Sequence, residues 1–122
     1  MRHRPVRLPG PEGGRHHRDV RRAGDSTHVG VLEVDLHLPY SRSLKTKRAV
    51  VKPILEGARQ RYSVAAAEVA HQDRWQRTVL GLAAVAGSVG HVSDVLDQVE
   101  RFIWSNPDVE VLGAERHWLD RG

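Results

Sequence analysis

Hydrophobic and polar residues begin to alternate at Val29, where the first regular pattern of the chain starts. The apolar positions are Leu32, Val34, Leu36 and Leu38, and the polar positions between them are Glu33, Asp35 and His37. A period of two is typical of a strand with one buried face, because successive side chains point to opposite sides of a sheet. The pattern therefore predicts a strand that ends before Pro39.

The next segment changes to steps of three and four residues, which predicts an amphipathic helix. Ser41 or Ser43 can serve as its N-cap. Its apolar positions are Leu44, Val51, Ile54, Leu55, Ala58 and Tyr62. Pro53 lies well inside this segment, where it removes a hydrogen bond and clashes with the preceding turn at a cost of roughly 3 kcal/mol. We expect a kink there, or two shorter helices.

Two further apolar runs, residues 63–70 and 78–87, read as strands joined by the polar connector 71–77. Ser88 can cap a second helix, which ends at Asn106 and Pro107. Its apolar stripe comprises Val92, Val95, Leu96, Val99, Phe102 and Ile103. A last strand follows from Val109 to about Trp118, so the predicted order is βαββαβ.

With right-handed crossovers, this order gives a ferredoxin-like α+β sandwich: a four-stranded antiparallel sheet, strand order 4-1-3-2, with two helices on one face. The topology brings the end of the first strand, the start of the first helix and the 71–77 connector to one edge of the sheet. Side chains far apart in the sequence should therefore meet there.

The third predicted strand is apolar on both faces, although the sheet face without helices should be solvated. The neighbouring strand carries the small residues 65–67, which permit close approach of another sheet. We therefore predict a homo-oligomer that uses the open sheet face. The alternative is that Glu33, Asp35 and Glu68 keep this face wet.

Composition limits the possibilities further. A chain of 122 residues with 39% hydrophobic residues can form one modest core. Without cysteine there are no disulfides and no thiolate ligands or nucleophiles, and no apolar run approaches the roughly 20 residues of a membrane span. A signal-peptide h-region is also missing, so the expected location is the cytoplasm, with no membrane partner.

The net charge of +4 comes entirely from residues 1–27, which hold seven arginines against three acidic residues. The rest of the chain, the predicted domain 28–122, is neutral, so overall charge gives no reason to expect nucleic-acid binding by the folded part. Residues 1–27 mix Arg, His, Gly and Pro without periodicity, and we expect a disordered arm. The arm is either a flexible cationic tail or the product of a start codon assigned too far upstream.

Two segments resemble signature segments of the YlxP-like family of uncharacterised bacterial proteins. They are Ser43-Leu44-Lys45-Thr46-Lys47-Arg48 and the stretch from Glu68 to Arg77, and the similarity covers about residues 28–120. The resemblance implies a ferredoxin-like fold that self-associates. It also implies a link to translation, because genes of the family often neighbour ribosome-assembly and initiation genes. It provides no catalytic residues.

The predicted edge carries a local cluster of cationic residues: Arg42, Lys45, Lys47, Arg48, Arg74 and Arg77. Together with the positive end of the first helix, such side chains can hold phosphates, while Trp75 could stack a base. The alternative is that these charges only solvate the start of a helix. The candidate binding residues are these six with His71, Gln72, Asp73, Trp75 and Gln76.

His71, Asp73 and Glu68 form the one acid–base cluster that the sequence suggests. A nucleophile is not evident, so hydrolysis by His71 and Asp73 is only a secondary alternative, and the preferred interpretation is that Asp73 forms an Asx turn. The remaining histidines of the predicted domain, His28, His37, His91 and His117, lie on separate elements, so no metal site and no cofactor are predicted. The first hypothesis is a non-enzymatic module that binds RNA or the ribosome. A structural or regulatory protein-interaction module is the alternative.

Overall fold

The computed structural model describes residues 26–119 and contains the six elements in the predicted order. They are β1 His28–His37, α2 Leu44–Tyr62, β2 Ala65–Ala70, β3 Arg77–Ala86, α3 Val89–Trp104 and β4 Glu110–Trp118. The prediction for residues 1–27 falls almost entirely outside the described residues.

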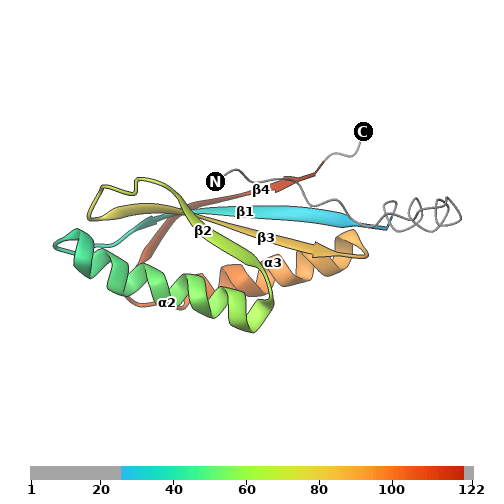
Figure 1. Cartoon of the computed structure of the whole chain (residues 1–122), viewed down its shortest axis with the longest axis horizontal. Coiled ribbons are helices and arrows are strands. Elements are labelled where there is room, and N and C mark those ends of the chain that lie inside the picture. Colours follow the sequence, from blue (N-terminus) through green and yellow to red (C-terminus); the bar gives the residue numbers. More distant parts are fainter. Residues whose placement is uncertain (1–25, 120–122) are drawn as a thin grey trace, which may run out of the picture.

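The four strands form one antiparallel sheet in the order β2-β3-β1-β4. β1 lies in the middle, where it pairs with β3 along its whole length and with β4 on its other side. Both helices lie on the same side of the sheet (Figure 1). The ferredoxin-like α+β fold predicted from the sequence is therefore confirmed.

The core lies between this sheet face and the helices, as the periodicities require. Alternate residues of β1 and β3 are buried, and so is one stripe on each helix. Gly30 permits a close approach of β1 to α3, because a Cβ there would lie 2.8 Å from Val92 Cγ1 and 3.2 Å from Leu96 Cδ1. The fully buried large side chains are Leu32, Val34, Leu36, Leu38, Ile54, Leu80, Leu82, Val92, Leu96, Val99 and Ile103.

α2 is one helix that continues through Pro53, so the alternative of two shorter helices is not found. Ser43 is its N-cap, and Ser63 ends it in the left-handed conformation with φ 57°. Because Ser63 is needed as the C-cap, β2 begins at Ala65, two residues later than the sequence pattern suggested.

The second helix is held against its neighbours by two different contacts. The Phe102 ring lies over Gly57 of α2, where a Cβ would come within 2.6 Å of it. On the other side, the Arg116 guanidinium of β4 contacts Asp97 at 2.8 Å and Glu100 at 3.1 Å. Partial burial opposes the charge, but the hydrogen bonds and attraction of the two carboxylates outweigh it and raise the pKa of Arg116.

Within the described residues, neither helix has the length and hydrophobicity needed to cross a lipid bilayer.

Candidate functional site

The start of α2 and the 71–77 connector meet at one end of the molecule (Figure 1). The Gln76 side-chain amide donates to the Ser41 carbonyl at 3.1 Å, and the Leu38 N–H donates to the Gln76 carbonyl at 2.9 Å. The convergence expected from topology is therefore present, and direct hydrogen bonds hold the two segments together.

Lys47 joins the two segments from the inside. Its ammonium lies 2.7 Å from Glu68 Oε2 and donates to the His71 carbonyl at 2.6 Å, and its side chain is only 3% exposed. Thr78 Oγ1 donates to the same Glu68 oxygen at 2.6 Å. We call these groups the Lys47 cluster: the side chains of Lys47, Glu68 and Thr78 with the His71 carbonyl. Lys47 was expected to contact phosphate, but burial and these partners make its ammonium inaccessible to an external ligand.

The start of α2 is closed by a capping box. Ser43 Oγ accepts from the Thr46 N–H at 3.1 Å, and Thr46 Oγ1 accepts from the Ser43 N–H at 3.0 Å and the Arg42 N–H at 2.9 Å. The cap uses the Thr46 N–H, which is therefore not available to a phosphate at the positive end of the helix. The first turn carries no acidic side chain, so no carboxylate offsets its positive end.

Four cationic side chains of the two joined segments are exposed: Arg42, Lys45, Arg48 and Arg74. We call this set the cationic rim. Over residues 26–119, none of the four takes part in an ion pair. Trp75 follows Arg74 directly and is 55% exposed. Proteins that bind single-stranded nucleic acids combine positively charged surfaces with aromatic side chains on which bases stack.

The other predicted site residues are not part of the cationic rim. Arg77 forms an ion pair with Asp35 at 2.9 Å on the open sheet face, so it is not part of the cationic rim. The Gln72 side chain points back to the Glu68 carbonyl at 3.5 Å. Asp73 is exposed, and the structure gives its carboxylate no hydrogen bond within the described residues.

His71 and Asp73 do not form an acid–base pair in the described part of the chain, since no hydrogen bond joins them. His71 has a left-handed backbone with φ 62°, which turns its carbonyl toward Lys47. Glu68, the third predicted member, is occupied by Lys47 and Thr78. The arrangement is that of a structural turn.

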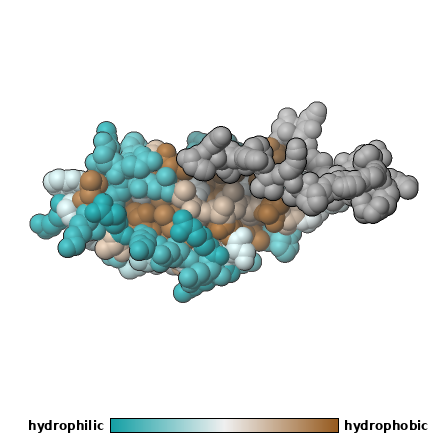
Figure 2. All heavy atoms as spheres, viewed as in Figure 1, coloured by the Kyte–Doolittle hydropathy of each residue, from teal (hydrophilic) through white to brown (hydrophobic). Residues whose placement is uncertain are grey.

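A shallow groove of about 280 Å³ lies next to the cationic rim, between α2 and β2. Val51 and Leu55 form its apolar floor, and Arg48, Lys52 and Arg59 lie along it. Apolar surface along the molecule above α2 is visible in Figure 2. Arg48 thus belongs to both the groove and the rim.

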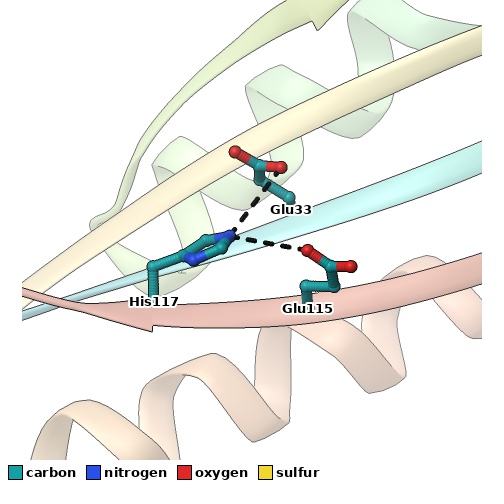
Figure 3. A group of neighbouring side chains, drawn as sticks. All are labelled: Glu33, Glu115 and His117. Carbon is teal, nitrogen blue, oxygen red and sulfur yellow. Dashed lines mark ion pairs between the residues drawn. The ribbon is translucent and has the colours of Figure 1, made fainter.

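The sequence analysis missed a second cluster, on the open sheet face. Glu33, Glu115 and His117 lie close together there, although His117 was considered isolated because it belongs to a separate element (Figure 3). Its neighbours come from strand pairing, which places β4 beside β1. Only the strand order and register together could have revealed this, because no local motif links the three residues.

Fold and surface define the chain as a ferredoxin-like α+β protein with a cationic rim at one end of the sheet. It belongs to the family described as "Protein of unknown function (DUF503)", which it matches over residues 29–116. It is 37% identical over 91 residues to the uncharacterized protein YlxP of Bacillus subtilis (strain 168), covering 75% of this chain and 99% of that protein. The resemblance proposed from the two segments is therefore confirmed.

Among solved structures, the chain is similar to the de novo designed protein Foldit4, with 15% identity and a TM-score of 0.48. The similarity covers 77% of this chain and 99% of the designed one.

Proposed function

We propose that this protein binds RNA through the cationic rim, with Trp75 as a stacking platform. The observation that carries the proposal is that four exposed cations, which have no ion-pair partner among residues 26–119, come from two segments joined by the Lys47 cluster. Charges held on such a preorganised frame lose less entropy on binding than charges on a free loop. The neutral overall charge of residues 28–122 makes this local concentration the relevant feature.

The chemistry fits a phosphate backbone rather than a single small anion. Arginine predominates in the rim, and its planar guanidinium can bind phosphate oxygens through two N–H groups at once. An aromatic ring beside such charges can stack any base, so we expect weak sequence preference and a strong dependence on salt. An association with ribosomal RNA would be one instance of this binding.

The test is fluorescence anisotropy of a labelled single-stranded RNA with the full chain at several salt concentrations. We expect the triple variant Arg42→Ala/Arg48→Ala/Arg74→Ala to weaken binding and to reduce the slope of log K against log salt by about 2, since each single-strand phosphate contact contributes about 0.7. Trp75→Ala should weaken binding by about tenfold or more, because alanine substitution of a ring on which a base stacks costs about 1 to 3 kcal/mol.

The matched control is Arg61→Ala, measured against the single variant Arg74→Ala. Arg61 lies in the last turn of α2, at the opposite end of the helix from the rim, and its loss changes the net charge equally. The seven arginines of residues 1–27 are the same in every variant, so their contribution cancels in the comparison. Equal losses for Arg61→Ala and Arg74→Ala would refute a site at the rim and indicate unspecific attraction instead.

A second candidate function, a self-associating structural module, rests on the apolar half of the open sheet face. Val85 is 66% exposed and Val69 is 48% exposed, and Ala65 and Ala67 lie on the same side of the sheet. Large exposed side chains next to small ones on a sheet face without helices suit contact with a second copy of this chain.

Light scattering at micromolar concentration tests this candidate. We expect a dimer or larger assembly for the natural chain and a monomer for Val85→Asp, which places a charge on the proposed contact surface. Val89→Asp is the control, because Val89 is 50% exposed but lies at the start of α3, away from the sheet face. A monomeric mass for the natural chain would exclude the candidate.

A further inference from the structure

The cluster on the open sheet face has the composition of a metal-binding site. His117 Nε2 lies 3.7 Å from Glu115 Oε1 and 3.9 Å from Glu33 Oε1. The three potential ligand atoms all lie within 4.8 Å of one another. In Figure 3 the carboxylates of Glu33 and Glu115 both point toward the same ring nitrogen of His117.

The backbone itself holds these three side chains together. Glu33 of β1 is the register partner of Glu115 of β4, so the two carboxylates stand directly opposite each other on adjacent strands. His117 follows two residues after Glu115 and therefore points to the same face. All three positions belong to regular strands in the sheet, which is a more rigid frame than a loop.

Within the described residues, the two carboxylates of the cluster have only the imidazole of His117 as an ion-pair partner. Like charges directly opposite each other in an antiparallel pair are destabilising. Asp35, the next residue on this face of β1, is compensated by Arg77 at 2.9 Å. Among the described residues, no lysine or arginine forms an ion pair with Glu33 or Glu115, and the imidazole approaches them only at 3.7 and 3.9 Å. A cation between the carboxylates would remove this repulsion.

Space for the rest of a coordination shell is present beside the ligands. A hollow of about 320 Å³ on the open face is lined by Glu33, Asp35 and Glu115 together with Gly113. A Cβ placed at Gly113 would meet no atom within 4 Å, so solvent can reach the carboxylates from that side. Water molecules could therefore complete the coordination that three protein ligands leave open.

We propose that Glu33, Glu115 and His117 bind a divalent transition-metal ion of the Zn²⁺ type. One imidazole nitrogen with two carboxylate oxygens suits such ions, whereas Mg²⁺ and Ca²⁺ prefer oxygen ligands alone. Zinc–ligand bonds of about 2.1 Å in a tetrahedron place the ligand atoms about 3.4 Å apart. The two distances from His117 are only a few tenths of an ångström longer, and exposed side chains can close that difference by small rotations.

The first test is a titration of the full chain with ZnCl₂, followed by the NMR signals of the histidine rings. Residues 1–27 contain three histidines that can bind zinc independently, so the readout must resolve His117. We expect the His117 ring signals to change first and to saturate at one equivalent. His117 signals that stay unchanged in molar excess of zinc would overturn the proposal.

Substitutions separate ligation from general charge effects. Glu115→Gln should weaken zinc binding at His117 by about tenfold or more, because the loss even of groups that only orient a ligand costs that much. The matched control is Glu110→Gln, which removes one carboxylate from a neighbouring histidine–glutamate pair on β1 and β4. That pair, His37 with Glu110 at 2.8 Å, has only one carboxylate. Equal weakening by both variants would contradict a site at His117.

Thermal unfolding gives a second measurement that does not depend on the first. Zinc should raise the unfolding midpoint of the natural chain and of Glu110→Gln, but not that of Glu115→Gln, since only an intact site gains stability from the ligand. Without metal, Glu115→Gln should be at least as stable as the natural chain, because it removes one of two opposed charges. A metal-free Glu115→Gln variant that is clearly less stable would show that the carboxylate serves the fold and not a cation.

Discussion

Lys45 and Lys47 lie in the same turn of α2, but their ammonium groups have opposite surroundings. Lys45 is exposed and belongs to the cationic rim, whereas the Lys47 side chain is 3% exposed and bound by Glu68 and the His71 carbonyl. Two positions along a helix differ by about 200° around its axis, so one of the two faces solvent when the other faces the sheet. The comparison shows that a basic run in a sequence can combine a buried structural residue and a solvent-exposed one.

The difference between the Lys47 cluster and the cationic rim is one of desolvation. A buried ammonium is tolerated only when partners replace its lost water, and Lys47 has a carboxylate and two backbone carbonyls. The rim cations keep their water and have no ion-pair partner within the described residues, so they remain available to an external anion. The Lys47 cluster fixes the 71–77 connector against the start of α2, and this contact determines where Arg74 lies relative to the other cations of the rim.

The largest effect that separates the two regions is expected from Lys47→Met. This substitution removes the ammonium from Glu68 and from the His71 carbonyl and leaves the Glu68 carboxylate only the hydrogen bond from Thr78. Breaking a buried ion pair in this way costs about 3 kcal/mol. The control is Lys45→Met, which should change the free energy of unfolding by less than about 0.5 kcal/mol, as surface substitutions usually do. Urea unfolding measures both values. Similar costs for the two variants would contradict the distinction between cluster and rim.

Much of the fold follows from local patterns, which explains why the sequence analysis predicted it correctly. The alternation in β1 and the spacing of three and four in α2 and α3 each reflect a single buried face. The start of β2 was predicted two residues too early, because Ser63 looked like part of a strand but ends α2 as its left-handed cap.

The site was predictable only in part, because topology gives proximity but not direction. The meeting of the helix start with the connector followed from the strand order, while the inward position of Lys47 and the pairing of Arg77 with Asp35 did not. Lys47 falls on the buried stripe with Val51 and Ile54, so helical periodicity could have revealed it if charge had not suggested exposure. The neighbours of His117 depended on the register between β1 and β4, which no local pattern encodes.

A smaller effect is expected at the cap that precedes both lysines. Ser43→Ala removes the oxygen that accepts from the Thr46 N–H, and loss of an N-cap costs about 1 kcal/mol. Ser43→Thr keeps this oxygen and should restore most of the stability. Thermal or urea unfolding of the three chains provides the comparison. An unchanged stability of Ser43→Ala would show that contacts other than the capping box fix the start of α2.

The smallest effect on the free energy of unfolding is expected from Arg77→Met. It tests whether burial or ion pairing makes the loss of Lys47 costly. Arg77 and Asp35 are 2.9 Å apart, 0.2 Å farther than Lys47 and Glu68 at 2.7 Å, but their side chains are 33% and 36% exposed. Water and salt screen such a pair, so its loss should cost about 0.5 kcal/mol at low salt and less at high salt. The control, Arg101→Met, removes an exposed arginine for which no ion pair occurs over residues 26–119. If Arg77→Met were as costly as Lys47→Met at both salt concentrations, ion pairing and not burial would set the cost of losing the cation. Exposed cations could then have structural roles as well.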